Sequence, residues 1–191
     1  MRGERYCVID VETTGFSPVA DRVVEIGCAE VEDDQIVARW STLVNPGRAI
    51  PAEATAVHGI TDAMVARAPG LRLALRYARR LCRGRIVAAH SARFDLSFVG
   101  RSVAVEALCT MRLARALFPE APNHKNQTLR QFLNIDGRAG ESFSAHRALG
   151  DALVTAHILI ACRRRFAALN DGRSWKRFVK ENALVVRCGQ G

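Results

Sequence analysis

The chain reads VIDVETTG from Val8 to Gly15, and the apolar residues Val8, Ile9 and Val11 predict a strand in the core of the fold. The surrounding segment Arg5–Val11 is rich in valine, isoleucine, tyrosine and cysteine, which predicts a buried β-strand. Asp10 and Glu12 are two residues apart on that strand, so their side chains point to the same face. Two buried carboxylates lose hydration and repel each other, a cost that Mg²⁺ or Mn²⁺ removes by accepting oxygen ligands. The alternative is that the strand ends at the surface and water solvates both acids.

The pattern on either side of this strand predicts an α/β domain. Arg22–Glu32 and Gln35–Val44 have the composition of two further strands with short links, which indicates an antiparallel meander. Amphipathic segments then alternate with one more short strand, Ile86–Ala89. The expected helices are Ala52–Val57, Gly70–Arg83, Ala92–Val103, Thr110–Leu117, Thr128–Leu133 and Ser144–Phe166, the last with Ser144 as its N-cap. We expect a sheet of mixed strand direction covered by helices.

Bulk properties narrow the class of protein. A length of 191 residues with 49% hydrophobic and 25% charged residues suits one soluble domain with a core of its own. The net charge of +9 favours nucleic acid or an anionic membrane, although a generic basic protein shares it. The six cysteines form no zinc-type cluster, and no export signal or membrane span is visible. We therefore expect free thiols, no membrane association and a cytoplasmic location.

A second candidate segment follows the strand Ile86–Ala89. It reads HSARFD from His90 to Asp95, at a strand end where a helix starts. Sites in α/β proteins assemble at the carboxyl ends of strands and in the loops that follow them. Asp95 has an alternative role, because the dipole of a helix favours an acid in its first turn.

A third candidate segment reads HRALGD from His146 to Asp151. Five residues rotate by roughly 140° on a regular helix, so the two side chains would not share a face. They converge on one site only if His146 lies on the loop before the helix. The alternative is a solvated histidine and a surface aspartate.

In this order the three segments resemble the DEDDh branch of the DnaQ-like 3′–5′ exonucleases. That family has Asp-x-Glu, then His-Asn-x-x-Phe-Asp, then His-x-x-x-x-Asp, and it includes the proofreading subunit of bacterial replicative polymerase. The resemblance runs from about Tyr6 to Cys162, with accessory matches at Val24–Gly27, Val57–Thr61 and Cys109–Arg115. Ser91 departs from the family's usual asparagine, and its side chain is shorter.

The resemblance implies an RNase H-like fold, a mixed five-stranded sheet flanked by helices. It also implies two divalent ions, Mg²⁺ or Mn²⁺, roughly 4 Å apart, which stabilise the attacking and leaving oxygens of an in-line displacement. The implied metal ligands are Asp10, Glu12, Asp95 and Asp151, and His146 is the implied general base, a task that suits histidine near neutral pH. The implied contacts of the terminal nucleotide are Thr13, Thr14, Val57, His58, His90, Ser91 and Phe94.

The resemblance leaves the substrate open. We expect single-stranded or frayed 3′ ends of DNA, as in proofreading or repair, and a DNA polymerase subunit as a partner. Trimming of RNA 3′ ends and a non-catalytic nucleic-acid-binding polymerase accessory module are the alternatives.

Two basic features have two interpretations each. We expect an exonuclease domain over residues 1–167 and a basic tail over 168–191, and the tail either holds a single strand by stacking and charge or docks on the domain or a partner subunit. The helix Gly70–Arg83 carries a stripe of five arginines, which is either a solvated outer face or a surface that follows phosphates.

Overall fold

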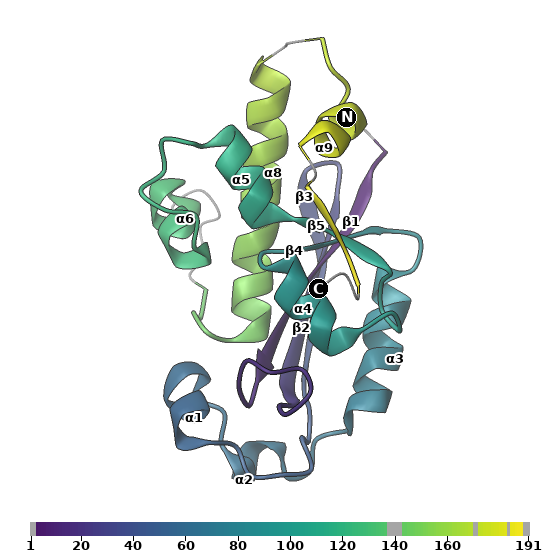
Figure 1. Ribbon diagram of the computed structural model, residues 1–191, viewed down its shortest axis with the longest axis vertical. Coiled ribbons are helices and arrows are strands. Elements are labelled where there is room, and N and C mark those ends of the chain that lie inside the picture. The colour runs from purple at the N-terminus through teal and green to yellow at the C-terminus, as the bar shows by residue number, and fades with distance from the viewer. Residues whose placement is uncertain (1–2, 137–142, 170–171, 183, 189–191) are drawn as a thin grey trace.

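The computed structural model describes residues 3–136, 143–169, 172–182 and 184–188. One mixed sheet organises them, with the strand order β3-β2-β1-β4-β5-β6 (Figure 1). The first three strands form the expected antiparallel meander, β4 and β5 extend it in parallel with β1, and β6 closes the far edge antiparallel to β5. The strands are β1 (Arg5–Thr13), β2 (Val23–Glu32), β3 (Gln35–Leu43), β4 (Ile86–Ala89), β5 (Glu106–Cys109) and β6 (Val185–Arg187).

Helices cover both faces of the sheet. On one face lie α5 (Thr110–Leu117), α6 (Asn126–Phe132) and the long α8 (Ala148–Leu169), and on the other lie α3 (Leu71–Cys82) and α4 (Ala92–Val99). The short α1 (Ala52–His58) and α2 (Asp62–Val65) lie at the end of the sheet where β1 stops (Figure 1). No helix among the described residues is long and apolar enough to cross a membrane.

Strand β1 is buried between the two layers of helices. Tyr6 and Val8 belong to the core cluster around α8, whereas Cys7, Ile9 and Val11 belong to the cluster around α3 and α4. Alternation along the strand therefore directs Asp10 and Glu12 toward the α8 face. The hydrophobic pattern that makes β1 a central strand thus also determines where its two acids point.

The predicted fold class is confirmed, and several details differ from the sequence expectation, including the unpredicted helix α2 and the start of α6 at Asn126 rather than Thr128. The helix expected over Ala92–Val103 ends at Val99, where Gly100 takes a positive φ of 64°. The long helix begins at Ala148 and not at an N-cap Ser144, because His146 takes a φ of 56° and interrupts the helical path. Within the described residues the sheet has six strands and not five, since the basic tail adds β6. All six cysteines are free thiols, as expected.

Of the two interpretations of the tail, the structure shows docking on the domain. Helix α9 (Trp175–Glu181) buries Trp175 and Phe178 against Phe166 of α8, with ring centroids 5.3 and 4.9 Å from that phenyl ring. Ser174 caps α9 by accepting a hydrogen bond from the backbone N–H of Arg177 at 3.2 Å. The aromatic residues of the tail therefore contribute to the core around α8.

Candidate active site

Three carboxylates converge at the end of the sheet where β1 stops. Asp10 and Glu12 extend from β1, and Asp151 reaches them from the first turn of α8. One oxygen of each carboxylate lies within 4.8 Å of an oxygen of the other two. The structure thus brings together three of the four acids that the sequence analysis selected as metal ligands.

The start of α8 reaches these carboxylates because two glycines permit close contact between backbones. Gly27 pairs with Asp10 across the β1–β2 ladder, and a Cβ atom there would collide with the backbone of Ala148. Gly150 lies in the first turn of α8, where a Cβ atom would collide with the carbonyl of Ser144. A side chain at either position would push α8 or the preceding turn away from the sheet. The position of Asp151 therefore depends on both glycines.

Asp95 joins this cluster electrostatically, although its oxygens are outside the converging group of three. It is buried in the first turn of α4, where its backbone N–H donates to the carbonyl of Ser91 at 3.1 Å. Burial raises the pKa of Asp95 to about 7, against the lowering effect of backbone hydrogen bonds from Val11 and from its own turn. After burial, the charge of Asp95 is the strongest influence that raises the pKa of Asp10.

Burial and mutual repulsion raise the pKa of every acid in the cluster. The pKa of Asp10 lies well above its ordinary value, first through burial and then through the neighbouring carboxylates. Burial, and then the charge of Asp151, raises the pKa of Glu12 to about 8. Burial also raises the pKa of Asp151 itself. A set of carboxylate oxygens that repel one another in this way fits Mg²⁺ or Mn²⁺, because a hard cation supplies the missing positive charge.

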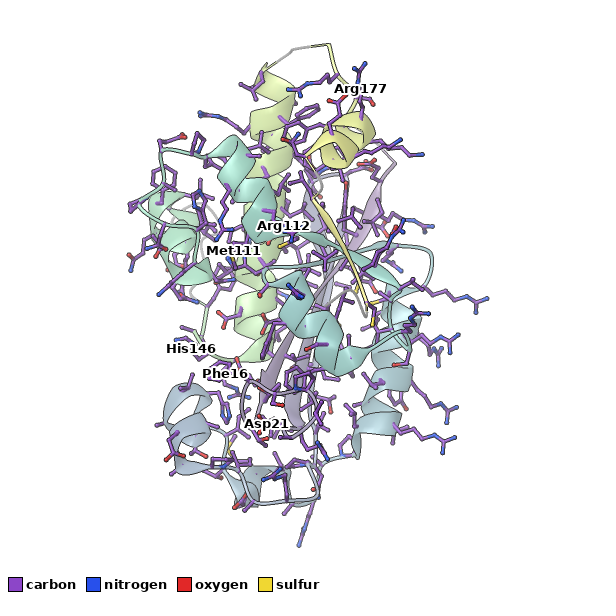
Figure 2. All side chains as sticks on the ribbon, in the orientation of Figure 1. Phe16, Asp21, Met111, Arg112, His146 and Arg177 are labelled. Atoms are coloured by element: carbon purple, nitrogen blue, oxygen red, sulfur yellow. The ribbon has the colours of Figure 1, made fainter. Side chains whose placement is uncertain are left out.

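His146 lies in the turn before α8, where convergence with Asp151 requires it to be. Its backbone N–H donates to Oδ2 of Asp151 at 3.0 Å, and its side chain is exposed. Figure 2 shows His146 in the lower half of the view, where Phe16 and Asp21 are also labelled. The positive φ of His146 turns the chain so that residues five apart approach the same site.

An ion pair that the sequence analysis missed supports this turn. Arg147 donates to both oxygens of the buried Glu25 on β2, at 3.0 and 2.6 Å, and the backbone N–H of Ala148 donates to the same carboxylate at 2.9 Å. Glu25 pairs with Glu12 across the β1–β2 ladder. The only available signal was the match of Val24–Gly27 to the family, which does not identify the partner of Glu25.

Helix α6 supplies a second support through Asn126 and Gln127, which lie just before the helix expected over Thr128–Leu133. Nε2 of Gln127 donates to Oδ1 of Asp151 at 2.7 Å. Nδ2 of Asn126 donates to Oγ1 of Thr155 at 2.8 Å and to the carbonyl of Asp151 at 3.3 Å. Both oxygens of the Asp151 carboxylate are therefore held by hydrogen bonds, one from α6 and one from the turn of His146.

Two residues of α1 and the end of β1 form one side of the site. His58 is buried, its Nδ1 accepts a hydrogen bond from the backbone of Ile60 at 3.0 Å, and burial lowers its pKa while the backbone of Thr13 opposes that effect. Nε2 of His58 is buried and has no hydrogen-bond partner within the described part of the chain. Val57 is exposed beside it.

Thr14 is held in its own loop, because its N–H donates to the carbonyl of Arg22 and its hydroxyl to Asp21.

The segment after β4 separates into buried and accessible residues. His90 is buried with both ring nitrogens occupied, Nδ1 by the hydroxyl of Thr110 at 3.0 Å and Nε2 by the carbonyl of His124 at 2.9 Å. Burial lowers the pKa of His90 to about 4, so its ring is neutral near pH 7. Ser91 begins α4 without capping it through its side chain. Phe94 is half-buried in the first turn of α4, next to Asp95 in the chain.

The ring of Phe94 contacts two other aromatic rings. Its centroid lies 5.0 Å from that of Phe98 and 6.3 Å from that of Phe16. Phe16, which the sequence analysis did not select, is 91% exposed at the tip of the loop after β1. An apolar ring in a turn segment, where polar residues are usual, was the signal that could have identified it.

Comparison with known proteins places this geometry in a family. The RNase T family model, described as an exonuclease, matches residues 7–159. Exonuclease X, solved in complex with 5′ overhanging duplex DNA, has a TM-score of 0.76 and 31% identity, with 93% of this chain and 99% of that chain covered. The nuclease domain of 3′hExo, a DEDDh family member bound to rAMP, has a TM-score of 0.69 over 84% of this chain and 92% of that chain. At 16% identity it shows the fold alone.

Curated relatives point the same way. The PolC-type DNA polymerase III of Caldanaerobacter subterraneus subsp. tengcongensis is 34% identical over 84% of this chain, and a DNA polymerase III subunit epsilon-like protein of Rhodobacter capsulatus is 37% identical over 81%. The chain spans 12% and 23% of the lengths of these two relatives. The match of the family model over most of the chain, together with the site described above, shows that the protein belongs to the RNase T family of exonucleases.

Proposed function

We propose that the protein hydrolyses phosphodiester bonds from the 3′ end of DNA and releases nucleoside monophosphates. The observation that carries this proposal is the convergence of Asp10, Glu12 and Asp151, with Asp95 beside Asp10. Exonuclease X was solved with duplex DNA, and two of the curated relatives carry the name DNA polymerase III. These relatives favour DNA as the substrate and support a DNA polymerase as a partner.

Asp10, Glu12, Asp95 and Asp151 would hold two divalent cations, Mg²⁺ or Mn²⁺. When bound, such cations stabilise the charge that develops on the attacked phosphate and on the leaving oxygen. The chain contributes rigid placement of the carboxylates. Asp10 and Glu12 are held by a strand buried on both faces, and Asp151 is held by Gln127 and by the turn of His146. Rigid placement matters because small displacements of reacting groups slow catalysis strongly.

His146 would take the proton from the attacking water. Its side chain is exposed and extends from a turn, while its backbone is tied to Asp151 and the next residue to Glu25. The ring can therefore adjust to a bound strand while its point of attachment stays fixed. Near neutral pH a histidine is well suited to accept a proton from water and to release it after the reaction.

The terminal nucleotide would lie between α1, the end of β1 and the start of α4. We assign its contacts to Thr13, Thr14, Val57, His58, Ser91 and Phe94, with His90 supporting the wall through Thr110 and His124. The buried Nε2 of His58 is placed to hydrogen-bond a hydroxyl or phosphate oxygen of the substrate. The rings of Phe94 and Phe16 offer apolar surface for a base or sugar.

Digestion of end-labelled strands tests the proposal. With Mg²⁺ or Mn²⁺, a 5′-labelled DNA strand should shorten step by step, and a 3′-labelled strand should release a labelled mononucleotide first. His146→Ala should slow cleavage about a thousandfold while Mn²⁺ binding persists in calorimetry, and Asp10→Ala should lose both.

Each other outcome has a clear meaning. Full activity of His146→Ala would show that another group accepts the proton. Faster digestion of RNA than of DNA would make RNA trimming the function. No degradation with either cation would contradict catalysis and leave a nucleic-acid-binding module.

A further inference from the structure

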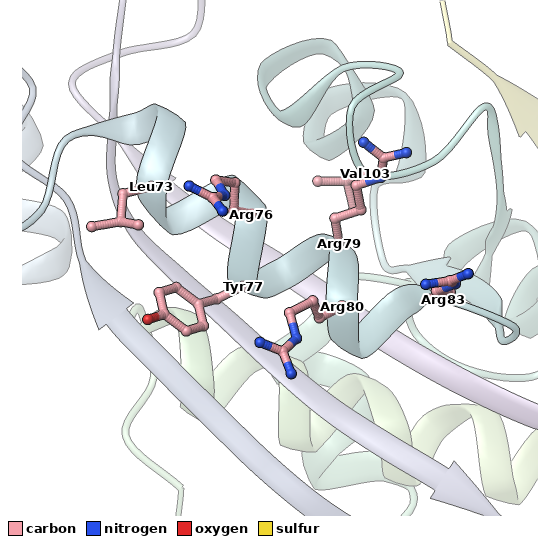
Figure 3. Close-up of a pocket in the computed structure, with 7 residues that line it drawn as sticks. All are labelled: Leu73, Arg76, Tyr77, Arg79, Arg80, Arg83 and Val103. Atoms are coloured by element: carbon pink, nitrogen blue, oxygen red, sulfur yellow. The ribbon is translucent and has the colours of Figure 1, made fainter.

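Helix α3 carries a continuous row of exposed arginines. Arg72, Arg76, Arg79 and Arg80, with Arg83 at the C-cap, fall within an arc of roughly 100° around the helix axis and are all exposed. We refer to these five residues as the arginine face. It is about 16 Å long, the length that about five phosphates occupy along one strand of DNA. Figure 3 shows four of its members, Arg76, Arg79, Arg80 and Arg83, on the pocket that they line.

The arginine face is not neutralised by the protein. From Ala63 to Phe94 the chain has eight arginines and no acidic residue. Within the described residues none of the five arginines forms an ion pair or a side-chain hydrogen bond. Arg85, close by in sequence, behaves differently, because it pairs with Glu30 at 2.6 Å and Glu32 at 3.2 Å.

Like charges on α3 oppose helix formation. Arg72 and Arg76, Arg76 and Arg80, and Arg79 and Arg83 are each four residues apart, a spacing at which equal charges repel and destabilise a helix. No acidic residue in the sequence of α3 offsets this repulsion. A polyanion laid along the row would remove the repulsion, whereas water and mobile counterions only screen it.

Beside the arginines lies a groove with apolar and aromatic walls. It has a volume of about 670 Å³ and is lined by Leu73, Tyr77, Val103 and four of the arginines (Figure 3). Tyr77 is 51% exposed, and its ring centroid lies 6.4 Å from that of Trp40 on β3. Positive charge interleaved with aromatic rings is the combination that binds nucleic-acid strands, since phosphates pair with the charges and bases stack on the rings.

The groove and the carboxylates lie on opposite faces of the sheet. Helix α3 packs in the cluster that contains Cys7, Ile9 and Val11, whereas Asp10 and Glu12 point to the α8 face. A nucleotide in the active site therefore cannot also touch the arginine face. Only nucleic acid that continues well beyond the cleaved end can reach both.

We propose that the arginine face is a second nucleic-acid contact, which holds the phosphate backbone of long substrates away from the cleaved end. The proposal rests on the proposed function in taking nucleic acid as the substrate. It accounts for unpaired arginines on a face that the active site does not use. A contact of this kind raises affinity and rate for long substrates and leaves the chemistry at the 3′ end unchanged.

The test compares Arg76→Gln/Arg80→Gln with the control Arg101→Gln/Arg164→Gln. Both double variants remove two exposed positive charges, and the control arginines lie outside the groove. Binding of a long labelled single strand and a long duplex is measured in chelator over a range of salt concentrations. Cleavage of the long strand and of a dinucleotide is then measured with Mg²⁺.

We expect the α3 variant to bind long nucleic acid about tenfold more weakly and to reduce the slope of log affinity against log salt by about 1.5. The dinucleotide should be cleaved at the wild-type rate, and the control should change affinity less than about twofold. Equal losses in both variants would show that only net charge matters and would overturn the proposal. Wild-type affinity of the α3 variant for long nucleic acid would also overturn it. Binding to phosphatidylserine vesicles is measured as well, and a variant that loses vesicle binding but keeps nucleic-acid binding would contradict the proposal. If wild-type protein binds through α3 and cleaves neither substrate, the proposed function fails and this contact stands.

Discussion

Helix α8 carries an acid and an arginine into the protein, Asp151 in its first turn and Arg163 about three turns later. Arg163 is surrounded by acceptors, since its guanidinium donates to Asp34 at 2.5 Å, to Glu4 at 2.6 Å and to the hydroxyl of Tyr6 at 2.6 Å. Asp151 instead faces Asp10 and Glu12, which carry charge of the same sign.

The two sites show opposite solutions to buried charge. At Arg163 opposite charges and hydrogen bonds offset the loss of hydration, and Nε1 of Trp175 donates to the same tyrosine hydroxyl at 2.9 Å, which ties α9 to β1. At Asp151 like charges raise one another's pKa, so the folded chain keeps a repulsion that only a bound cation or protons remove. A cluster that opposes folding indicates a functional site, whereas a compensated one indicates structure.

The largest expected effect comes from removing one charge at the carboxylate site that Asp10, Glu12 and Asp151 form. Asp10→Asn should lower the cleavage rate by at least about a thousandfold, because a metal ligand is lost. In chelator the same substitution should raise Tm by about 3 °C, the shift that about 1 kcal/mol produces in a chain of this size, because one repelling charge is removed. Activity assays and thermal melts measure the two effects.

Asp34→Asn is the matched control for that substitution. It removes a carboxylate from the compensated site, and asparagine tolerates the positive φ of 60° at this position. It should lower Tm and leave cleavage unchanged. If both substitutions lowered Tm in chelator, the contrast between the two sites would be wrong.

Removing the positive charge of Arg163 should produce the largest loss of stability. Arg163→Met leaves Glu4 and Asp34 without their partner and should lower the free energy of unfolding by about 3 kcal/mol. The cleavage rate of the folded protein should stay at the wild-type level, because Glu4, Asp34 and Tyr6, to which Arg163 donates, are not residues of the site. Urea unfolding measures the loss, and unchanged stability would mean that the network contributes little.

Much of the first site could be predicted from the sequence, because rigid local geometry determines it. A spacing of two on a strand leaves Asp10 and Glu12 no other choice than one face. A spacing of five cannot place His146 and Asp151 together on a regular helix, so their convergence required His146 to lie outside the helix, and the structure shows a turn there at φ 56°. The bounds of helix α3 were predicted to within one residue at each end, because its apolar residues recur at helical spacing.

The parts that could not be predicted depend on contacts between distant elements. The pair of Glu25 and Arg147 exists because α8 packs across β2 at Gly27, and no local pattern encodes that contact. Strand β6 has three residues, too few for any periodic signal. The composition of the tail is equally suited to docking and to binding a strand, so only the burial of Trp175 and Phe178 separates the two.

A third substitution removes the ion-pair partner of Glu25, the buried acid opposite Glu12 on the neighbouring strand. Arg147→Gln leaves Glu25 buried opposite Glu12 and loosens the turn that carries His146. We expect kcat to fall about tenfold with KM little changed, together with a lower Tm in chelator.

Arg85→Gln is the control for Arg147→Gln, because it breaks an arginine–glutamate pair at the far end of the same strand. It should lower Tm and leave kcat unaffected. Equal loss of kcat in both variants would assign the effect to general destabilisation of β2.

The smallest expected effect is a change of stability with pH, in which the carboxylate site outweighs the opposite contribution of the buried His90. Glu12 and Asp95 have pKa values raised to about 8 and about 7, whereas unfolded acids titrate near pH 4, at about their ordinary values. Between these limits the folded chain binds more protons than the unfolded chain, so these groups make stability fall as pH rises. In chelator, Tm should therefore drop by about 3 °C from pH 6 to pH 8, and Mg²⁺ should restore it at pH 8 more than at pH 6.

Asp10→Asn should flatten this dependence, because it removes a charge that faces Asp95, whereas Arg163→Met should shift the whole curve downward without changing its slope. A Tm that rises toward pH 8 in wild-type protein without metal would mean that the carboxylates do not repel one another as their positions require.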